Sequence, residues 1–328
     1  MKAKFNTLVV LLILPLFNLA AQDFLLSQPW SATTTIAPSF AGFTGGGRVY
    51  TTYRNQWSAI EGSQTILADY DQYFHPIRSS FGGLLSYTSY AGGMLSQLQF
   101  DIQYNYAVQM TKHWYFRPGL QLSVFYRTID PSKFVFVDQI AMDGTILPTS
   151  SFQTSINSLF RFDAAVSVMF YNEYFFGGLS VSRLLGNNVS FTDAPSTTDP
   201  LKLNVYAAGM IPISKGYGKY DPKDDVTIAT LYQWQGQYHQ IDIDVMYHRR
   251  YFMAGIGYRG IPFYSPDGLT NTDALKVMVG GSVAGFSVSY SYDVSLSSLV
   301  NVSGGSHEVV LTYRFMEKAP NDRSFFCY

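Results

Sequence analysis

The sequence is dominated by segments of about ten residues in which polar and apolar side chains alternate. In Leu98–Val108 an apolar or aromatic residue stands at every second position, and polar residues stand between them except at Ala107. His239–Tyr247 and Phe286–Val294 repeat the pattern. A period of two places the two sets on opposite faces of a β-strand, and about 9 to 11 residues suffice for a tilted strand to cross a bilayer. The chain is therefore predicted to cross a membrane with strands.

Such segments recur along almost the whole chain, and about fourteen can be counted. They are expected near residues 46–57, 63–74, 79–90, 95–109, 113–127, 158–171, 174–183, 201–213, 226–235, 238–248, 251–260, 274–284, 286–294 and 305–315. Short connections such as His75–Arg78 alternate with long ones such as Thr128–Asn157. Barrels of the outer membrane have short periplasmic turns, long outside loops and an even number of strands. The predicted fold is all-β: a transmembrane antiparallel β-barrel of about 14 strands, of the outer-membrane type.

Composition favours this barrel over a soluble β-sandwich. Charged residues make up 14% of the 328 residues, against roughly 25% in typical soluble domains, whereas aromatic residues reach 16%. A sandwich would have short turns at both ends and gives no reason for the many charges on the polar faces. The formal net charge of −1 offers no attraction to nucleic acid, so no nucleic-acid partner is expected.

Residues 1–21 are predicted to be a cleaved signal peptide for export, and the barrel is expected in the outer membrane. Two lysines precede the apolar run Leu8–Leu14, and Ala20 and Ala21 are small residues suited to cleavage. Pro15 interrupts the run, which is too short for a spanning helix of about 20 residues.

The regions on either side of the barrel do not alternate. Residues 22–45 contain prolines and a glycine-rich end, and they either hang in the periplasm or fold into the lumen as a plug. Residues 46–315 form the predicted barrel, and residues 316–328 a short periplasmic tail.

The lumen-facing positions of the predicted strands carry charges of both signs. Mixed signs favour pairing across strands that rigidifies the wall, rather than a ring of one sign that selects ions. Asp293, Glu308 and Arg127 lie on these faces. The candidate lumen charge network comprises Arg48, Arg54, Asp69, Asp71, Asp101, Arg161, Asp163, Asp242, Asp244 and Arg314.

One connection breaks the alternation of loop lengths. Ser214–Asp225 is long and charged, yet it falls on the predicted periplasmic side. It is either a solvated turn or a docking surface for a periplasmic partner. Its candidate docking residues are Lys215, Lys219, Asp221, Lys223, Asp224 and Asp225.

No catalytic residue, cofactor or metal is expected. The stretch GIGYRG at Gly255–Gly260 matches a dinucleotide fingerprint, but it lies in a predicted strand instead of opening a helix. The five histidines lack the spacing of metal ligands. Ser306 and His307 cannot form one catalytic triad, because adjacent residues of a strand point to opposite faces.

Several stretches resemble the PorP/SprF family of outer-membrane proteins of the type IX secretion and gliding machinery of Bacteroidota. They occur in the family's order and span nearly the whole mature chain. Ala37 departs from the family pattern, which commonly has Asn there. The stretches are IAPSFAG at Ile36–Gly42, YRNQW (Tyr53, Arg54, Asn55, Gln56, Trp57), ISKG at Ile213–Gly216, YQWQGQYHQIDI at Tyr232–Ile243, and SGGSHEVVLTYRF, which begins with Ser303, Gly304, Gly305, Ser306, His307 and Glu308.

The resemblance implies a fourteen-strand barrel without enzymatic activity that supports secretion or cell-surface anchoring of an adhesin-like client. Its implied partners are that client, other type IX secretion or gliding subunits, some of them peptidoglycan-associated, and outer-membrane lipid. A passive outer-membrane porin or solute transporter is the alternative, supported by the polar interior. In either case YRNQW is expected at the outer rim, with Tyr53 and Trp57 toward lipid, Arg54 and Gln56 toward the lumen, and Asn55 at headgroup level.

Overall fold

The computed structural model describes residues 24–60, 62–135, 137–141, 143, 145–148, 157–191, 198–213, 224–261, 271–296 and 302–315. The predicted signal peptide and the predicted tail at 316–328 lie outside these residues.

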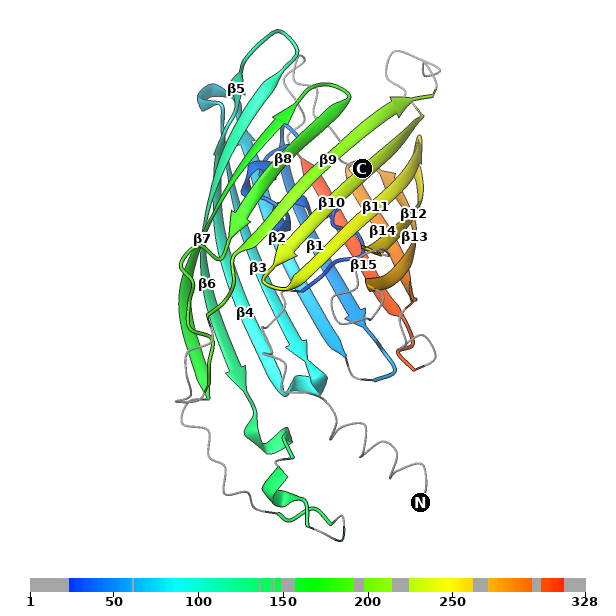
Figure 1. Ribbon diagram of the computed structural model, residues 1–328. Helices are drawn as coiled ribbons and strands as arrows, with labels where there is room; N and C mark the ends of the chain where they lie inside the picture. Colours follow the sequence, from blue (N-terminus) through cyan, green and yellow to red (C-terminus); the bar gives the residue numbers. More distant parts are fainter. Residues whose placement is uncertain are drawn as a thin grey trace.

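All strands among these residues belong to one antiparallel sheet of 15 strands, whose arrangement is shown in Figure 1. One of them, β5, has only 2 residues and continues β4 beyond Ala107, where the polar alternation of the sequence breaks. The remaining fourteen are long strands. The strands are β1 Gly47–Gln56, β2 Ser63–Phe74, β3 Ser79–Tyr90, β4 Leu95–Tyr106, β5 Val108–Gln109, β6 Tyr115–Ile129, β7 Ser158–Tyr171, β8 Phe175–Ser182, β9 Lys202–Pro212, β10 Asp225–Gln235, β11 Tyr238–Arg249, β12 Phe252–Ile261, β13 Asn271–Val283, β14 Phe286–Ser295 and β15 Ser306–Phe315.

The sheet closes on itself. Each long strand pairs with the next one along the chain, with β4 pairing directly with β6. The first and last strands then pair in a register that runs from Gly47 opposite Phe315 to Gln56 opposite Ser306. This pairing, called the seam below, leaves no free edge. The prediction of a closed antiparallel barrel of about 14 strands is confirmed.

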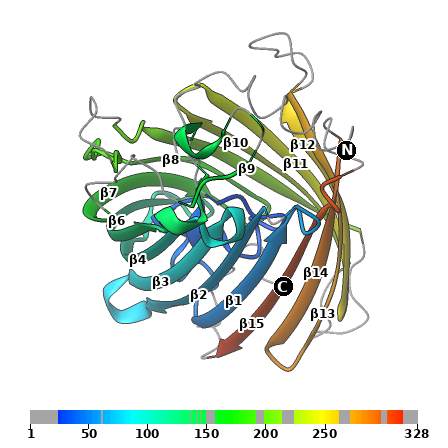
Figure 2. The same ribbon diagram turned by 90° about the horizontal axis from the view of Figure 1, so that it is seen from below.

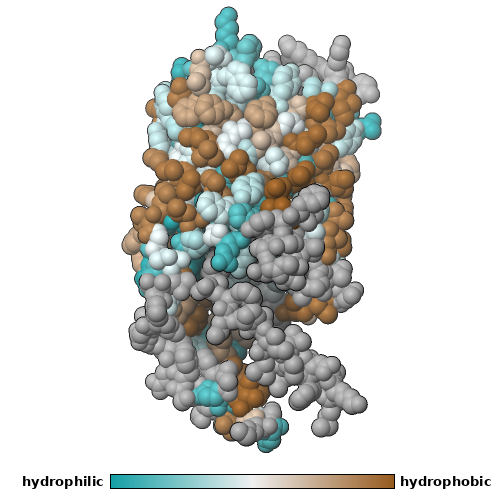
Figure 3. Space-filling model, in the orientation of Figure 1, coloured by the Kyte–Doolittle hydropathy of each residue, from teal (hydrophilic) through white to brown (hydrophobic). Residues whose placement is uncertain are grey.

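Side chains sort by face along each strand. On β4, Gln99, Asp101 and Gln103 are buried inside the barrel, whereas Phe100 and Ile102 are exposed on its outer surface. In the space-filling view, apolar residues gather over the outer surface of the strands (Figure 3). An apolar exterior and a polar interior are the arrangement of a barrel surrounded by lipid.

The two ends of the barrel differ. The end at which β1 begins, called the turn end, has short connections such as Ala284–Gly285 between β13 and β14. The end at which β1 finishes, called the loop end, has the long β6–β7 and β8–β9 connections. There the β6–β7 connection extends beyond the barrel and contains the 3-10 helices η5 (Pro131–Lys133) and η6 (Val137–Gln139) (Figure 1). Two further 3-10 helices, η3 (His75–Ile77) and η4 (Ala91–Gly93), lie in connections. Among the described residues, no helix has the length and apolar character needed to cross a membrane.

Residues 24–46, called the luminal segment below, lie inside the barrel (Figure 2). They contain the 3-10 helices η1 (Thr33–Thr35) and η2 (Pro38–Phe40), and most of their residues are buried. Phe40 is fully buried, and its ring centroid lies 5.3 Å from that of Phe176 and 5.0 Å from that of Tyr206 on the barrel wall. The main hydrophobic core therefore lies between the luminal segment and the wall, and its aromatic wall residues belong to β7–β9, toward the turn end.

Candidate functional site: the luminal segment and the seam

The two predicted family motifs meet at the loop end of the seam. Arg54 lies opposite Glu308 and Gln56 opposite Ser306 in the β1–β15 register. Beyond the strands, the N–H of Ser58 donates to the carbonyl of Gly305 at 3.3 Å. YRNQW and SGGSHE are thus neighbouring segments that close the barrel at this end.

Two glycines of the second motif have backbone conformations that residues with a side chain rarely adopt. Gly304 and Gly305 both have a φ of 69°, in the left-handed region that favours glycine. A Cβ on Gly305 would lie 2.6 Å from the hydroxyl of Tyr292 and 2.7 Å from the carbonyl of Asp293. The tight turn into β15 therefore needs glycine for both its conformation and its space.

Glu308 connects the seam to the luminal segment. Its carboxylate accepts hydrogen bonds from the backbone N–H groups of Ser27, at 2.6 Å, and Gln28, at 2.8 Å. Arg54 lies 3.4 Å from Glu308 and 3.1 Å from Asp293, and its guanidinium also donates to the Ser27 hydroxyl. All of these side chains are buried, so the start of the luminal segment is held by charge-assisted hydrogen bonds in a low-dielectric interior.

A second ionic cluster lies on β11–β13. Asp242 forms salt bridges with Arg259 and with Lys276, each at 2.9 Å. Lys276 also forms a salt bridge with Asp244 at 2.8 Å. The indole N–H of Trp30 donates to Asp244 at 3.0 Å, and Arg259 donates to the carbonyl of Leu26. Removing one partner of such a buried pair leaves an uncompensated charge, which costs about 3–5 kcal/mol.

A third group of contacts holds the luminal segment near the turn end. Arg48 pairs with Asp71 at 2.8 Å, and Asp71 also accepts from the backbone N–H of Gly42 at 2.7 Å. Thr34 donates its hydroxyl to Asp69 at 2.9 Å. The Gly42 contact lies toward the opposite end of the segment from Ser27 and Gln28.

Neutral side chains of the wall satisfy the irregular backbone between these points. The amide nitrogen of Asn105 donates to the carbonyls of Pro38 and Ala41 at 2.9 and 2.8 Å. The carbonyl of Ile36 accepts hydrogen bonds from the Ser180 hydroxyl at 2.6 Å and from the Asn204 amide at 2.8 Å. A chain without regular secondary structure can lie in the lumen because the wall supplies its hydrogen-bond partners.

The predicted lumen charge network is only partly one network. Arg48, Arg54, Asp69, Asp71, Asp242 and Asp244 bind the luminal segment or one another, as described above. Asp101 accepts from Gln99, and Asp163 accepts from the backbone N–H groups of Arg183 and Leu185. Arg314 is partly buried and lies opposite Arg48 in the seam register.

Arg161 lies between the outward-facing Phe160 and Phe162 on β7, and its partners are backbone carbonyls. Its guanidinium donates to the carbonyls of Phe160, at 2.8 Å, and Asn188, at 3.1 Å. It lies near the loop-end start of β7, where backbone of the β8–β9 connection is closer than any lumen carboxylate of the described residues.

Sequence reasoning missed Arg259 and Lys276. Both are buried: Lys276 stands between the exposed Leu275 and Val277, and Arg259 follows the partly buried Tyr258. The alternation that identified the acids on β11 would have identified these two cations on β12 and β13. Arg259 belongs to the GIGYRG stretch, which lies within β12 and opens no helix.

The first motif lies largely as expected. Tyr53 is exposed on the outer surface, Arg54 is buried in the lumen, and Asn55 and Gln56 are partly buried. Trp57 differs, because β1 ends at Gln56 and Trp57 enters the following turn with a φ of 55°. It is a turn residue rather than the last position of the strand.

The candidate docking segment is only partly described. Lys215, Lys219, Asp221 and Lys223 lie outside the described residues. Asp224 lies 3.9 Å from the exposed Arg249. Asp225 is not part of a solvated connection: it begins β10, is buried, and lies 3.0 Å from Nδ1 of His248.

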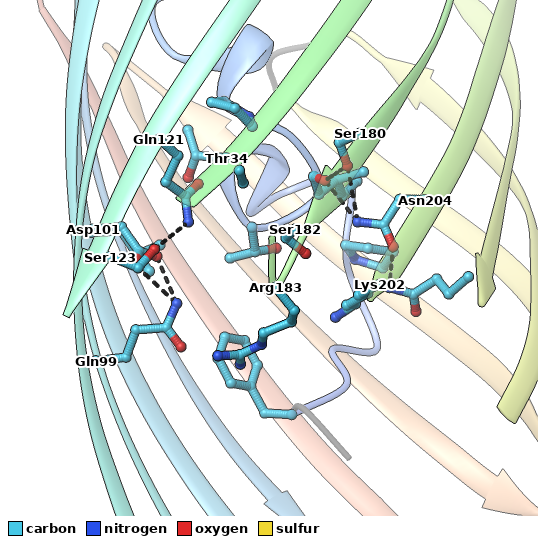
Figure 4. A pocket seen from close by; sticks show the side chains of 18 of the residues that line it. Thr34, Gln99, Asp101, Gln121, Ser123, Ser180, Ser182, Arg183, Lys202 and Asn204 are labelled. Carbon is cyan, nitrogen blue, oxygen red and sulfur yellow. Dashed lines mark hydrogen bonds between the residues drawn. The ribbon is translucent and has the colours of Figure 1, made fainter. Parts of the chain in front are cut away.

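Beside the luminal segment a cavity of about 70 Å³ remains (Figure 4). It lies between Gln99, Asp101 and Gln121 on one side and Ser180, Lys202 and Asn204 on the other (Figure 4). A buried water needs roughly 10–15 Å³ by this measure, so the cavity has room for a few waters or one small group. Among the described residues, no three His, Cys, Asp or Glu side chains are grouped as they would be to hold a metal ion.

A family model described as type IX secretion system membrane protein PorP/SprF matches residues 18–313. The chain belongs to the PorP/SprF family. The predicted resemblance to this family is thereby confirmed, and the seam contacts described above are contacts of a PorP/SprF protein. The family consists of secretion-system membrane proteins, and this member is an outer-membrane-type barrel.

Solved structures similar to the chain include porins. One is a mutant of Rh. blastica porin, with 10% identity and a TM-score of 0.35, covering 82% of this chain and 98% of that chain. Another is a triple mutant of Rhodopseudomonas blastica porin, with 11% identity, a TM-score of 0.34 and the same coverage. Similarity at this level says nothing about function. A search of curated proteins finds no match.

Proposed function

We propose that this PorP/SprF protein is an outer-membrane barrel of the type IX secretion and gliding machinery that supports secretion or surface anchoring of an adhesin-like partner. It acts through its loops and its periplasmic segments. Short turns lie in the periplasm and long loops outside in barrels of this type, so the loop end faces the cell exterior. The client, the other secretion subunits and the outer-membrane location are part of this proposal.

The filled lumen is the observation that supports an interaction protein most directly. The luminal segment is bound to the wall by Glu308 near one of its ends and by Asp71 near the other. Its aromatic side chains pack against the wall between these points. A passive porin needs a continuous aqueous path, and this interior instead binds a peptide along most of its length.

Planar-bilayer conductance of the purified full-length protein tests this distinction. We expect no large, stable, ohmic pore, because the luminal segment occupies the lumen. Regular single-channel steps of a size typical of porins, from every insertion event, would favour the passive-porin alternative.

Deletion of the gene tests the role in secretion. We expect adhesin display on the cell surface to fall and to return when the full-length protein is supplied. Undiminished display and gliding in the deletion strain would contradict the proposal.

The connection at residues 214–225 tests periplasmic association. Replacement of residues 214–223 by a short Gly-Asn turn keeps the wall residue Asp225. We expect a folded barrel that retains less of its periplasmic partners on co-purification. Unchanged co-purification would show that the connection is only a solvated turn.

A further inference from the structure

A row of uncharged polar side chains crosses the outer surface of the barrel near its loop end. We propose that the centre of this row, formed by His307, Asn55 and Gln64, binds the sugar headgroup of a glycolipid in the outer leaflet of the membrane. The assignment to the outer leaflet rests on the proposed function, in which the loop end faces the cell exterior. The site itself rests on the contacts that follow.

The polar row follows the register of neighbouring strands. His307 on β15 lies opposite Asn55 on β1, and Asn55 lies opposite Gln64 on β2. The row continues through Ser89 on β3 to Ser96 on β4. These strands are neighbours in the wall (Figure 2). Because each of the five side chains is exposed or only partly buried, the row is open to whatever surrounds the barrel.

The next outward-facing row toward the turn end is aromatic and aliphatic. Its side chains lie opposite one another on the same strands and are all exposed: Tyr290, Val309, Tyr53, Ile66, Tyr87 and Leu98. Apolar outer positions of a barrel contact acyl chains, and aromatic residues gather at the level where the lipid headgroups begin. The polar row therefore lies at headgroup level, next to side chains that contact lipid tails.

Free hydrogen-bonding groups gather at the centre of the row. The hydroxyl of Tyr290 shares a hydrogen bond of 2.8 Å with Nδ1 of His307, so only Nε2 of that ring remains. Nε2 of His307 and the side-chain amides of Asn55 and Gln64 have no hydrogen-bond partner among the described residues. Three neighbouring side chains can therefore bind a ligand at the membrane surface without first breaking a contact within the protein.

The imidazole of His307 is held in place before a ligand arrives. Its ring centroid lies 6.2 Å from that of Tyr290 and 4.9 Å from that of Tyr292. The same arrangement occurs near the loop end of β10–β11. There the hydroxyl of Tyr232 bonds to Nδ1 of His239 at 2.7 Å, and the two ring centroids are again 6.2 Å apart. A histidine fixed by a tyrosine is thus a repeated feature of this surface, and a fixed side chain loses little freedom on binding.

The chemistry of the row indicates the class of ligand. None of its five residues is an acid, a lysine or an arginine. Amides both donate and accept hydrogen bonds, as do sugar hydroxyls and an imidazole in its neutral form. A phosphate is an anionic acceptor, which arginine matches best. Exposed arginines lie at the turn end instead, at Arg78 and Arg249. The loop end therefore suits the hydroxyls of a sugar rather than a phosphate.

Lipid binding by the full-length protein in a neutral polyoxyethylene detergent tests the site. The probes are three lipids with the same acyl chains: a monoglucosyl diacylglycerol, phosphatidic acid and diacylglycerol. Native mass spectrometry measures the affinity of each. We expect the glucosyl lipid to bind about tenfold more tightly than the other two, because its hydroxyls gain hydrogen bonds from the row. Equal binding of the glucosyl lipid and diacylglycerol would overturn the proposal, and a preference for phosphatidic acid would overturn the assignment to sugars.

Matched variants separate recognition by the row from adsorption to the apolar surface. The double variant Asn55→Val with Gln64→Leu keeps side chains of similar size and removes both amides. It should bind the glucosyl lipid about tenfold more weakly and diacylglycerol as before. Ser158→Ala, at the loop-end start of β7 and outside the row, should leave both affinities unchanged. Heat-modifiable gel mobility checks that each variant is folded, and unchanged glucosyl-lipid binding by the folded double variant would refute the site.

Cysteine labelling on intact cells tests the leaflet. Cys327 is the one cysteine of the sequence and is first replaced by serine. Lys133→Cys, in the β6–β7 connection, should then react with a membrane-impermeant maleimide, and Arg249→Cys, at the turn end, should react only after permeabilisation. The reverse pattern would overturn the assignment to the outer leaflet. Neither experiment uses the secreted partner, so failure of the lipid site is distinct from failure of the proposed function, which the deletion strain decides.

Discussion

Arg54 and Glu308 lie opposite each other in the two strands that close the barrel, and their side chains meet inside the lumen at 3.4 Å. The same carboxylate binds two consecutive N–H groups of the luminal segment. One side chain therefore contributes both to closure of the wall and to retention of the segment.

Glu308→Gln should destabilise the protein by about 3 kcal/mol, because Arg54 loses part of its compensation and the two N–H groups lose an anionic acceptor. Thermal unfolding in detergent, followed by gel mobility, measures the effect. Asp143→Asn is the control, since Asp143 is exposed in a loop and bonds only locally to Thr145. A Glu308 variant as stable as this control would contradict the role given to the carboxylate.

Gly305→Ala should be clearly more destabilising than Gly186→Ala. Both glycines have a positive φ, 69° and 53°. The left-handed conformation should therefore destabilise both alanine variants by a similar amount, roughly 1–2 kcal/mol. A Cβ on Gly186 meets nothing within 4 Å, whereas one on Gly305 would contact Tyr292 and Asp293 below 3 Å. The difference between the two variants in thermal unfolding isolates the contact at the seam, and equal effects would exclude it.

Phe40→Ala should loosen the luminal segment and produce brief conductance events that the unmodified protein lacks. The buried ring contacts Phe176 and Tyr206, and truncation of a core Phe costs about 3–5 kcal/mol. Phe100→Ala, on the outer surface, is the matched control and should give no such events. Silent bilayers with both variants would show that this cluster does not keep the lumen filled.

Lys276→Met should lower the free energy of unfolding by about 3–5 kcal/mol. Asp242 and Asp244 both lose their salt bridge to Lys276, and only Asp242 keeps the one to Arg259. The double variant Lys276→Met with Asp244→Asn removes one charge of each sign and should recover part of the loss. With Asp244→Asn measured alone, losses that simply add in the double variant would show that the two charges are not coupled.

The strands could be predicted from sequence because their side chains obey a local rule. The alternation places Arg54 in the lumen and Tyr53 on the outer surface, and its break at Ala107 coincides with the end of β4. The same rule also predicts that Arg259 and Lys276 face the lumen, once it is applied to cations as well as acids.

The luminal segment obeys no such rule. Its backbone is satisfied by side chains far away in the chain, such as Glu308, which is 281 residues from Ser27. The partners of Arg161 also could not be predicted, because they are carbonyls, and one belongs to a connection whose path the alternation does not determine. Trp57 shows a related limit, since the pattern of aromatic residues continues past the residue at which the strand ends.

The attachment of Ser27 to Glu308 also bears on how the barrel is assembled. The segment that precedes β1 has a charged partner on β15, the last strand, and this contact spans 281 residues of sequence. Contacts of such long range form late, because the entropy of closing a long chain loop must first be overcome. We therefore expect filling of the lumen and joining of the first and last strands to occur as one cooperative step, without an empty closed barrel as an intermediate.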